Sequence, residues 1–550
     1  MKEGSSFAPL RHTIFRRIWT ASLLSNFGLL INGVGAGWAM TEMSGKPQDV
    51  ALVQTALMLP YMLFSMLAGA ISDTYDRRKT AIAMLCFAST SAILLVASAW
   101  SGLLNPTLLL VLCFLIGTAN AMFGPAWQAS VSEQVPAHDV APAVALNSVS
   151  YNIARSFGPA VGGIIVAAAG SVAAFAVTAV CYLPIMLALY FWRRMPDPPR
   201  LPPERIGWAT ISGIRYIFHS PSMRNVIMRC ATMGIAGASI SSLMPLIARD
   251  LVGGKAATYG ILLGAFGMGA VFGALLMPIL GRRLSREVHV GGGTAIMGAA
   301  VILLSFCRSE LAAIPTLIVA GICWMQALTS FNIAIQTQAP RWVVGRALAA
   351  FQAATAGGIA AGAWVWGHVS EWLGTAGGVG LSGVALLACV PLGLLWRMAG
   401  EGTDVSAREE PLPSPEVGLA LTGRSGPISI EIEYRVPAER ARQFYDTMLA
   451  VALFRQRNGA YQWSLARDIA QPDYWIERFS CPTWHDYLRQ RDRMTTGEAA
   501  ILDRAAAETL DGEPYRVRRW LERPIGSVRW QTETRDPGVT LPFHPASGSP

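Results

Sequence analysis

The chain has 550 residues, of which 52% are hydrophobic and only 14% are charged, and its mean hydropathy is +0.39. These values are typical of a membrane protein and exclude a set of ordinary soluble domains. The net charge of +9 is uneven: residues 1–400 hold 25 Lys and Arg against 13 Asp and Glu, a net of +12, whereas residues 401–550 hold 19 against 22, a net of −3. The basic excess therefore flanks apolar segments, and we expect no nucleic-acid partner.

Metal-binding and nucleotide-binding motifs are missing from the chain. The eight cysteines are scattered, without a Cys-x-x-Cys pair or a Cys/His cluster, so the sequence predicts neither a disulfide framework nor a metal site. It also contains no phosphate-binding loop of the Gly-x-x-x-x-Gly-Lys-Ser/Thr type, which ATP-driven proteins need. We therefore expect no cofactor, no metal and no enzyme activity.

Twelve long apolar runs dominate residues 14–398. Each is long enough for a helix to cross the hydrocarbon core of a bilayer, which takes about 20 residues. They cover residues 14–41, 50–72, 80–100, 106–128, 144–169, 172–192, 223–248, 257–280, 290–307, 312–338, 346–372 and 376–398. Six runs precede a break at residues 193–222 and six follow it. We therefore predict an all-α membrane part with twelve transmembrane helices in two six-helix halves.

The connections between these runs carry their basic residues mainly on one side. If the N-terminus is inside, seventeen Lys and Arg lie in inside segments, against four in outside loops: Lys46, Arg249, Lys255 and Arg308. Such a bias marks the cytoplasmic side of a membrane. We therefore predict a multi-pass protein of the bacterial inner membrane with both termini in the cytoplasm.

The break at residues 193–222 has two parts. Five prolines between residues 196 and 203 prevent a helix and favour an extended linker. Apolar residues then recur at near-helical spacing over residues 206–218, which predicts an amphipathic helix lying on the inner surface of the membrane. We expect the whole segment to be a cytoplasmic linker between the halves.

The chain changes character after residue 398. Acidic residues and prolines make residues 399–425 a solvated linker. Strict alternation over Ile428–Tyr434 predicts a strand with one buried face. Further strands are predicted at 460–465, 474–479 and 515–521, and helices at 437–454, 484–488 and 495–508. This order suggests an α+β domain of ferredoxin-like type. The predicted segments are 1–192 and 223–398 for the halves, 193–222 and 399–425 for the linkers, 426–523 for the cytoplasmic domain and 524–550 for a disordered tail.

A charged stretch separates the second and third apolar runs. It reads Gly-Ala-Ile-Ser-Asp-Thr-Tyr-Asp-Arg-Arg-Lys over residues 69–79. By itself it indicates a cytoplasmic loop. It also resembles the loop between the second and third helices of the major facilitator superfamily, with Asp76 where that family usually has a second glycine. The residues that match the family motif are Gly69, Asp73, Arg77, Arg78 and Lys79. The resemblance implies an inner gate in which Asp73 faces the start of the eleventh helix, near Gly345 and Arg346.

The fifth run contains Arg155 followed by a Gly/Pro pattern. Gly158, Pro159, Gly162 and Gly163 resemble the fifth-helix motif of exporters in the same superfamily, although the motif's earlier glycine is Ala154 here. Proline bends a helix and glycine permits close backbone approach, so a tightly packed helix without an exporter role is the alternative interpretation. Arg155 cannot lose its charge and needs water or an acceptor, so we interpret it as a functional residue or as one that snorkels to the inner interface.

Amide side chains occur inside several apolar runs. Polar groups within a membrane span usually face a cavity, but hydrogen bonds between helices that only fix packing are an alternative. The candidates for the substrate cavity are Asn26, Asn32, Gln54, Asn120, Gln128, Asn152, Asn332 and Gln336.

The long Pro-rich central loop and the stretch from Pro136 to Gly163 make the chain most similar to the bacterial transmembrane secretion effectors, which include enterobactin exporters. This resemblance implies secondary active export of a small organic molecule, a drug-like compound or a siderophore, by alternating access, with the lipid bilayer and a coupling ion, the proton, as further partners. The fourth-helix arginine motif that the superfamily links to proton coupling has no counterpart in residues 106–128.

Two alternatives remain for the function. One is an uptake permease for a metabolite built on the same fold. The other is a transporter whose C-terminal domain is a ligand sensor or a monooxygenase-like enzyme. That domain also offers a surface for self-association.

Overall fold

The structure is a computed structural model that describes residues 8–192, 206–283, 285–340, 342–398, 415–510 and 516–522. The chain forms two compact units. The first, which we call the helical unit, comprises residues 1–210, 222–336 and 345–400. The second, the sheet unit, comprises residues 211–221, 337–344 and 401–550. The Pro-rich stretch, most of the 399–425 linker and the tail from 524 lie outside the described residues.

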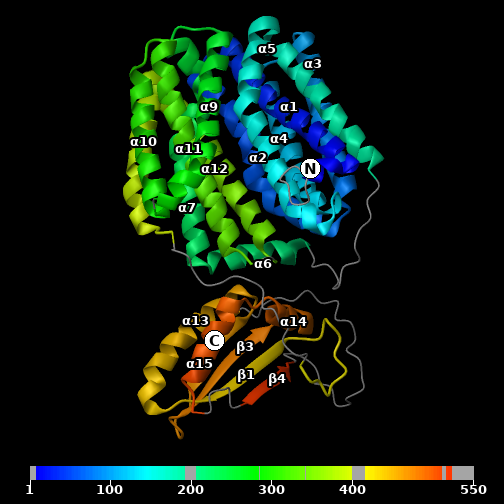
Figure 1. Cartoon of the computed structure of the whole chain (residues 1–550), viewed down its shortest axis with the longest axis vertical. Coiled ribbons are helices and arrows are strands. Elements are labelled where there is room, and N and C mark those ends of the chain that lie inside the picture. Colours follow the sequence, from blue (N-terminus) through cyan, green and yellow to red (C-terminus); the bar gives the residue numbers. More distant parts are fainter. Residues whose placement is uncertain are drawn as a thin grey trace. The chain divides into compact units, whose positions relative to one another are not determined.

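Long helices make up the helical unit (Figure 1). They are α1 (Thr13–Met43), α2 (Pro47–Thr74), α3 (Arg77–Trp100), α4 (Pro106–Ser130), α5 (Val140–Phe191), α7 (Pro221–Ser242), α8 (Met244–Leu246), α9 (Ala256–Arg283), α10 (Arg286–Phe306), α11 (Glu310–Gln338) and α12 (Val344–Leu395), with the short turns η1 (Ala8–Arg11), η2 (Val131–Glu133), η3 (Ala137–Asp139) and η4 (Ile247–Leu251). Ten described helices are long and apolar enough to cross a membrane. We call α1–α5 the N-terminal half and α7–α12 the C-terminal half.

Two of these helices are each 52 residues long and contain a break at a glycine. Gly170 has φ 78° and ψ 175°, and Gly374 has φ 75° and ψ 165°. Glycine adopts such positive φ values without steric cost, so each helix consists of two segments that meet at this residue. The sequence predicted separate helices here, with gaps at 170–171 and 373–375. Each break lies in one of these gaps.

The predicted helix at 223–248 lies within a helical span from Pro221 to Leu251, and the second part of this span is irregular. Helix α7 ends at Ser242, and the short helix α8 and the π-helical turn η4 follow it. Pro245 explains the interruption, because proline lacks the N–H that a continuous helix needs. The chain therefore changes helical pitch just before Arg249.

The sheet unit contains residues 211–218 of helix α6 (Ile206–Phe218) and the C-terminal domain. The domain's elements are β1 (Ile428–Arg435), η5 (Ala438–Arg440), α13 (Ala441–Arg457), β2 (Tyr461–Arg467), β3 (Tyr474–Cys481), α14 (Trp484–Asp492), α15 (Thr496–Ala507) and β4 (Arg516–Leu521). The strands form an antiparallel sheet in the order β2-β3-β1-β4. Every strand and helix predicted for this domain is present.

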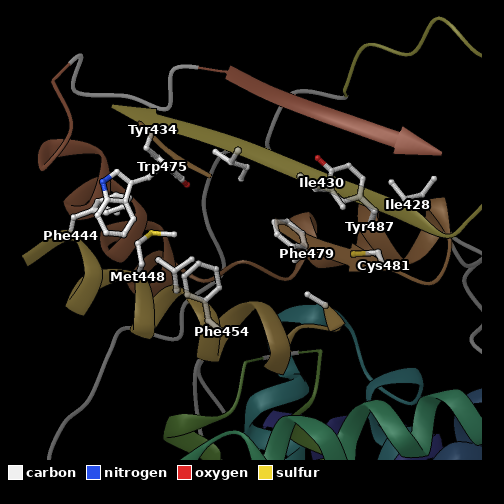
Figure 2. Packing of buried hydrophobic residues seen from close by; sticks show 14 of the residues in the cluster. Ile428, Ile430, Tyr434, Phe444, Met448, Phe454, Trp475, Phe479, Cys481 and Tyr487 are labelled. Carbon is white, nitrogen blue, oxygen red and sulfur yellow. The ribbon is translucent and has the colours of Figure 1, made fainter. Parts of the chain in front are cut away.

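One face of this sheet packs against α13 and α15 (Figures 1 and 2). Alternate residues of β1, from Ile428 to Tyr434, point into this core, as the sequence pattern predicted. The core also encloses Glu477, which is fully buried and accepts hydrogen bonds from Arg455 (3.1 Å), the Tyr434 hydroxyl (3.0 Å) and Trp463 (3.0 Å). Such a buried carboxylate is tolerated because its partners replace water. Trp475 and Trp484 belong to the same core, and Trp463 packs against it.

Candidate functional site

The helix-five motif lies where the two halves of the helical unit touch. A Cβ atom placed on Gly163 would lie only 2.1 Å from the Cα atom of Gly260 in α9. A Cβ on Gly267 of α9 would likewise lie 2.3 Å from the carbonyl oxygen of Ser156. Only glycine permits such close contact between helix backbones. The motif therefore brings α5 of one half directly against α9 of the other.

Two further glycines of the motif face α1 within the N-terminal half. A Cβ on Gly158 would lie 3.0 Å from the Cβ of Leu30, and one on Gly162 would lie 3.1 Å from the Cβ of Val34. Pro159 lies inside the helix between them. The glycines of the motif thus allow α5 to pack closely between α1 and α9. Its role in export stays a prediction.

Hydrogen bonds also join the halves, near the end of the bundle that carries the α1–α2 turn. The Arg249 guanidinium donates to the carbonyl oxygens of Thr41 (3.4 Å) and Gly45 (3.1 Å). Nearby, the rings of Trp38 and Tyr259 stack with centroids 6.1 Å apart. Arg249 follows the break at Pro245, so the interruption of α7 positions a side chain that ties one half to the other. Sequence reasoning counted Arg249 only as a loop charge.

A similar tie connects α2 and α12. The Thr55 hydroxyl donates to the carbonyl oxygen of Ala360 at 2.9 Å. A Cβ on Gly367 would lie 2.8 Å from the Cβ of Ala51. Because Ala51 is one turn from the start of α2, this contact also lies near the α1–α2 turn. We call this end of the bundle, with Arg249, the tied end.

The predicted gate motif lies at the opposite end of α2. The expected loop over residues 73–79 is wrong, because α2 continues to Thr74 and α3 begins at Arg77. Only Tyr75 and Asp76 connect them. The Asp76 carboxylate accepts a hydrogen bond from the backbone N–H of Lys79 (2.9 Å), as an N-cap residue does. This cap accounts for an aspartate where the family motif has glycine.

The arginines of the motif bind within the N-terminal half. Arg77 donates to the Ala129 carbonyl (3.0 Å) and pairs with Glu133 (2.9 Å), just beyond α4. Arg78 donates to the carbonyl oxygens of Leu189 (2.7 Å) and Tyr190, at the end of α5. Carbonyl groups at a helix C-terminus attract cations, so the basic cluster is the signal in the sequence for these contacts. Sequence reasoning missed Glu133.

The other motif residues make fewer described contacts. A Cβ atom on Gly69 would meet no described atom of another helix within 4 Å, and Lys79 is exposed. Asp73 lies in the last turn of α2, but its side chain is outside the described part of the chain. The gate therefore stays a prediction.

Arg155 occupies an unusual position. It lies 15 residues from Val140 and 15 residues from Gly170, which are the ends of the first segment of α5. Every other Asp, Glu, Lys or Arg in the ten spanning helices lies within eight residues of an end of its helix or segment. The Arg155 side chain is partly exposed, and it makes no hydrogen bond or ion pair with the residues that the structure describes. A permanent charge thus lies at mid-span without a described protein partner.

The eight amide candidates fall into two groups. Asn120 is buried and donates to the Ile116 carbonyl (2.8 Å) and the Tyr182 hydroxyl (3.2 Å), so its amide fixes α4 against the second segment of α5. Asn32 is fully buried in α1, and neither of its amide atoms has a partner among the described residues. Both side chains are therefore closed off from solvent or lipid.

The other candidates reach the surface of the bundle or of a space within it. The Gln336 amide donates to the Asn332 side chain in α11. The partly exposed ones are Asn26, Gln54, Asn152 and Asn332, and the exposed ones are Gln128 and Gln336. Asn152 lies three residues before Arg155 and so shares its face of α5. Together these two give α5 a polar patch at mid-span.

A buried ion pair in the C-terminal half was missed from the sequence. Arg229 of α7 is buried and pairs with Glu287 of α10 at 2.6 Å. The Glu287 carboxylate also accepts a hydrogen bond from the Met398 backbone N–H. The partners are 58 residues apart, so no local pattern signals the pair.

Comparison with known proteins fits this architecture. A family model described as transmembrane secretion effector matches residues 4–525. The chain belongs to the transmembrane secretion effector family. It is 25% identical over 403 residues to the enterobactin exporter EntS of Salmonella typhimurium, covering 70% of this chain and 94% of that protein. The multidrug efflux pump Tap of Mycolicibacterium fortuitum is 25% identical over 344 residues, covering 59% and 83%.

A third relative is the staphyloferrin A transporter of Staphylococcus aureus, 24% identical over 262 residues, which cover 47% of this chain and 66%, just under two thirds, of that protein. Among solved structures, the nucleoside transporter NupG matches with a TM-score of 0.58 and 11% identity, covering 70% of this chain and 100% of that one. An auto-inhibited peptide transporter of the POT family matches with a TM-score of 0.57 and 12% identity, covering 70% and 96%. The structural matches support the fold alone. The family and these relatives are transporters, not enzymes, which confirms the expectation that the chain is no enzyme.

Proposed function

We propose that the chain exports a small organic molecule that carries an anionic group, across the bacterial inner membrane, by alternating access of its two halves. The names of the relatives, which include an enterobactin exporter and a multidrug efflux pump, support export of siderophore-like or drug-like compounds. In this proposal α5 and α12 each cross the membrane twice, which gives twelve spans and two cytoplasmic termini. The C-terminal domain has a ferredoxin-like fold, which the strand order β2-β3-β1-β4 supports.

The position of Arg155 is the observation that carries the substrate class. A charge at the centre of a bilayer is costly, so such a residue faces water or a partner of opposite charge. The described residues offer it no carboxylate, and a guanidinium does not deprotonate in proteins. A carboxylate or similar anion on the substrate supplies the missing partner and forms two parallel hydrogen bonds with the guanidinium. Asn152, one turn away, adds an amide to the same site.

The contacts between the halves support alternating access. They include Arg249 and the Trp38–Tyr259 stack at the tied end, and the glycines of α5 and α9 continue them toward mid-span. This arrangement fits a state in which that end is closed and the end with the α2–α3 turn admits substrate. We further propose that Asp73 and the basic residues after it control the second end, and that an ion gradient, of protons, drives the cycle.

A comparison of culture media tests the export proposal. We expect a strain that overexpresses the chain to enrich specific compounds in the medium, and a deletion strain to retain them. The enriched compounds should be anions at neutral pH. A deletion strain that instead fails to accumulate a nutrient would show that the direction is uptake.

Substitutions at Arg155 test the substrate class. The enriched anions should leave cells about tenfold or more slowly with Arg155→Gln, because one charge-assisted contact contributes roughly 1.5–3 kcal/mol, and Arg155→Lys should lie in between. Arg308→Gln is the matched control, since among the residues that the structure describes Arg308 binds the nearby carbonyl groups of Ser305 and Cys307. Equal export by the wild type and Arg155→Gln, with equal amounts of protein in the membrane, would reject the assignment.

A further inference from the structure

Two short segments that connect membrane helices belong to the same compact unit as the C-terminal domain. Residues 211–221 form the end of α6 and the turn into α7, and residues 337–344 connect α11 to α12. Each is far from the C-terminal domain in sequence. Two contacts between these segments and the C-terminal domain show what the domain binds.

The first contact involves Tyr216 near the end of α6. Its side chain is 1% exposed, and the guanidinium carbon of Arg457 lies 5.0 Å from the centroid of its ring. This is the geometry of a cation–π interaction, which strengthens as the pair loses water. Arg457 is held in place by an ion pair with Glu498, which is itself buried. A fixed cation therefore covers a buried aromatic ring.

The second contact involves Trp342 in the segment between α11 and α12. The guanidinium carbon of Arg493, at the end of α14, lies 3.9 Å from the centroid of its ring. The ring also packs edge to face against Tyr216, with centroids 5.2 Å apart and an interplanar angle of 88°. The two aromatic residues thus form one platform, from two separate segments, and the domain places an arginine over each ring.

The exposed side of α6 suits a different environment. Ile211, Ile214 and Phe218 are exposed and recur at helical spacing, so they form an apolar stripe apart from Tyr216. An amphipathic helix uses such a stripe to lie on a membrane surface. The helix therefore has an exposed apolar face besides the face that contacts the C-terminal domain.

We propose that the C-terminal domain is a clamp that binds the end of α6 and the α11–α12 connection through the Tyr216–Trp342 platform. Trp342 lies three residues before Gly345, where the sequence predicts the partner of the Asp73 gate. The clamp therefore restrains a connection that must move with α12, and release of the domain frees it. The partner of this surface is the protein's own pair of connecting segments, and this inference does not depend on the substrate or direction of transport.

Cross-linking of the full chain in membranes tests the contact directly. A protease site is placed between residues 404 and 410, and exposed Cys86 is replaced by Ser. The pair Trp342→Cys and Arg493→Cys should then be joined by a short bismaleimide, so that the domain stays covalently attached after the linker is cut. The matched control pairs Trp342→Cys with Ile469→Cys, because Ile469 is 99% exposed in the β2–β3 loop. Equal cross-linking of both pairs, or of neither, would overturn the proposal.

Retention of the domain on the membranes after the linker is cut provides a second measurement, which needs no cysteine at the contact. Without cross-linker, we expect the separated domain to stay on the membranes, and Arg493→Glu or Trp342→Ala to speed its release about threefold to thirtyfold, as the loss of one cation–π contact implies. Arg493→Lys and Trp342→Phe should have smaller effects. Arg442→Glu, the same charge change at an exposed site on α13, should release the domain no faster than the unsubstituted chain. Immediate release of the unsubstituted domain would refute the clamp.

Discussion

At the scale of single residues, Gly163 and Gly260 allow helices from different halves to meet backbone to backbone. The sequence indicated that Gly163 belongs to a motif for close packing, since its spacing is visible in α5 alone. It gave no sign of the partner, because Gly260 is one of many glycines in α9. Contacts between distant segments depend on how the helices assemble, and a local pattern carries no information about that.

We predict that Gly163→Ala lowers transport at least about tenfold. The added Cβ would lie 2.1 Å from the Gly260 Cα, so α5 and α9 must move apart, and overpacking of this kind costs about 1–3 kcal/mol. Export of the compounds found in the media comparison measures the effect. Gly124→Ala in α4 is the control, because its Cβ position has no described atom of another helix within 4 Å. Similar activity for both variants would show that the contact does not matter for the cycle.

Asp76 and Asn120 show the same division between local and distant information. The N-cap role of Asp76 follows from its position before Arg77-Arg78-Lys79 and was available from the sequence, although the motif comparison treated it as a departure. Asn120 binds Tyr182, which lies 62 residues away. No spacing rule distinguishes such an amide from one that lines a cavity. The structure was therefore needed to sort the candidates for the substrate path by their burial.

At the scale of elements, strands and helices were predicted best where periodicity is strong and local. The alternation in β1 gave its buried face correctly, and the long apolar runs marked the helices. Breaks were less predictable: Pro245 interrupts one helix, whereas α4 continues through Pro125 and α9 through Pro278. Whether a proline ends a helix depends on what neighbouring helices offer to the freed backbone groups, and that is decided by packing.

We predict that the stability of the sheet unit falls as the pH rises above about 9, partly because of Cys481 at the end of β3. Burial and the nearby Asp486 carboxylate raise the pKa of this thiol to about 12, against the opposing effect of Arg455 and Arg215. The unfolded thiol has a pKa of about 8.5. The folded pKa is the higher one, so the stabilisation is complete below pH 8.5 and is lost as the pH rises toward 12, because only the unfolded thiol ionises there.

The expected slope for this one group is about 1 kcal/mol per pH unit between pH 9 and 10. Hydrogen exchange of β1 and β3 amides in the full chain, corrected for the intrinsic exchange rate, measures it. Cys481→Ala should flatten the slope, while Cys86→Ala in α3 should leave the sheet unit unchanged. An equally steep slope in Cys481→Ala would assign the pH dependence to other groups, such as Tyr434, whose pKa burial also raises.

At the scale of the whole molecule, hydropathy and charge counts predicted two halves and placed most basic residues on the cytoplasmic side. These quantities describe each segment by itself. They contain nothing about which end of the bundle is closed, because that depends on side chains from both halves meeting, as Arg249 meets the carbonyl groups of Thr41 and Gly45. The balance between the two ends is a property of the assembled protein, and one residue at the tied end is enough to examine it.

Arg249→Met should shift that balance toward opening of the tied end. The substitution keeps the apolar stem but removes both hydrogen bonds to the N-terminal half. For a side chain that is 37% exposed, this loss is worth about 1 kcal/mol, which changes the population ratio of the closed and open states roughly fivefold. Spin labels on Lys46→Cys and Lys255→Cys, which are exposed near this end on different halves, should report longer distances in double electron–electron resonance. Arg308→Met is the control, because Arg308 binds Ser305 and Cys307 of its own half in the described part of the chain. A distance distribution unchanged by Arg249→Met would mean that Arg249 does not hold the halves together.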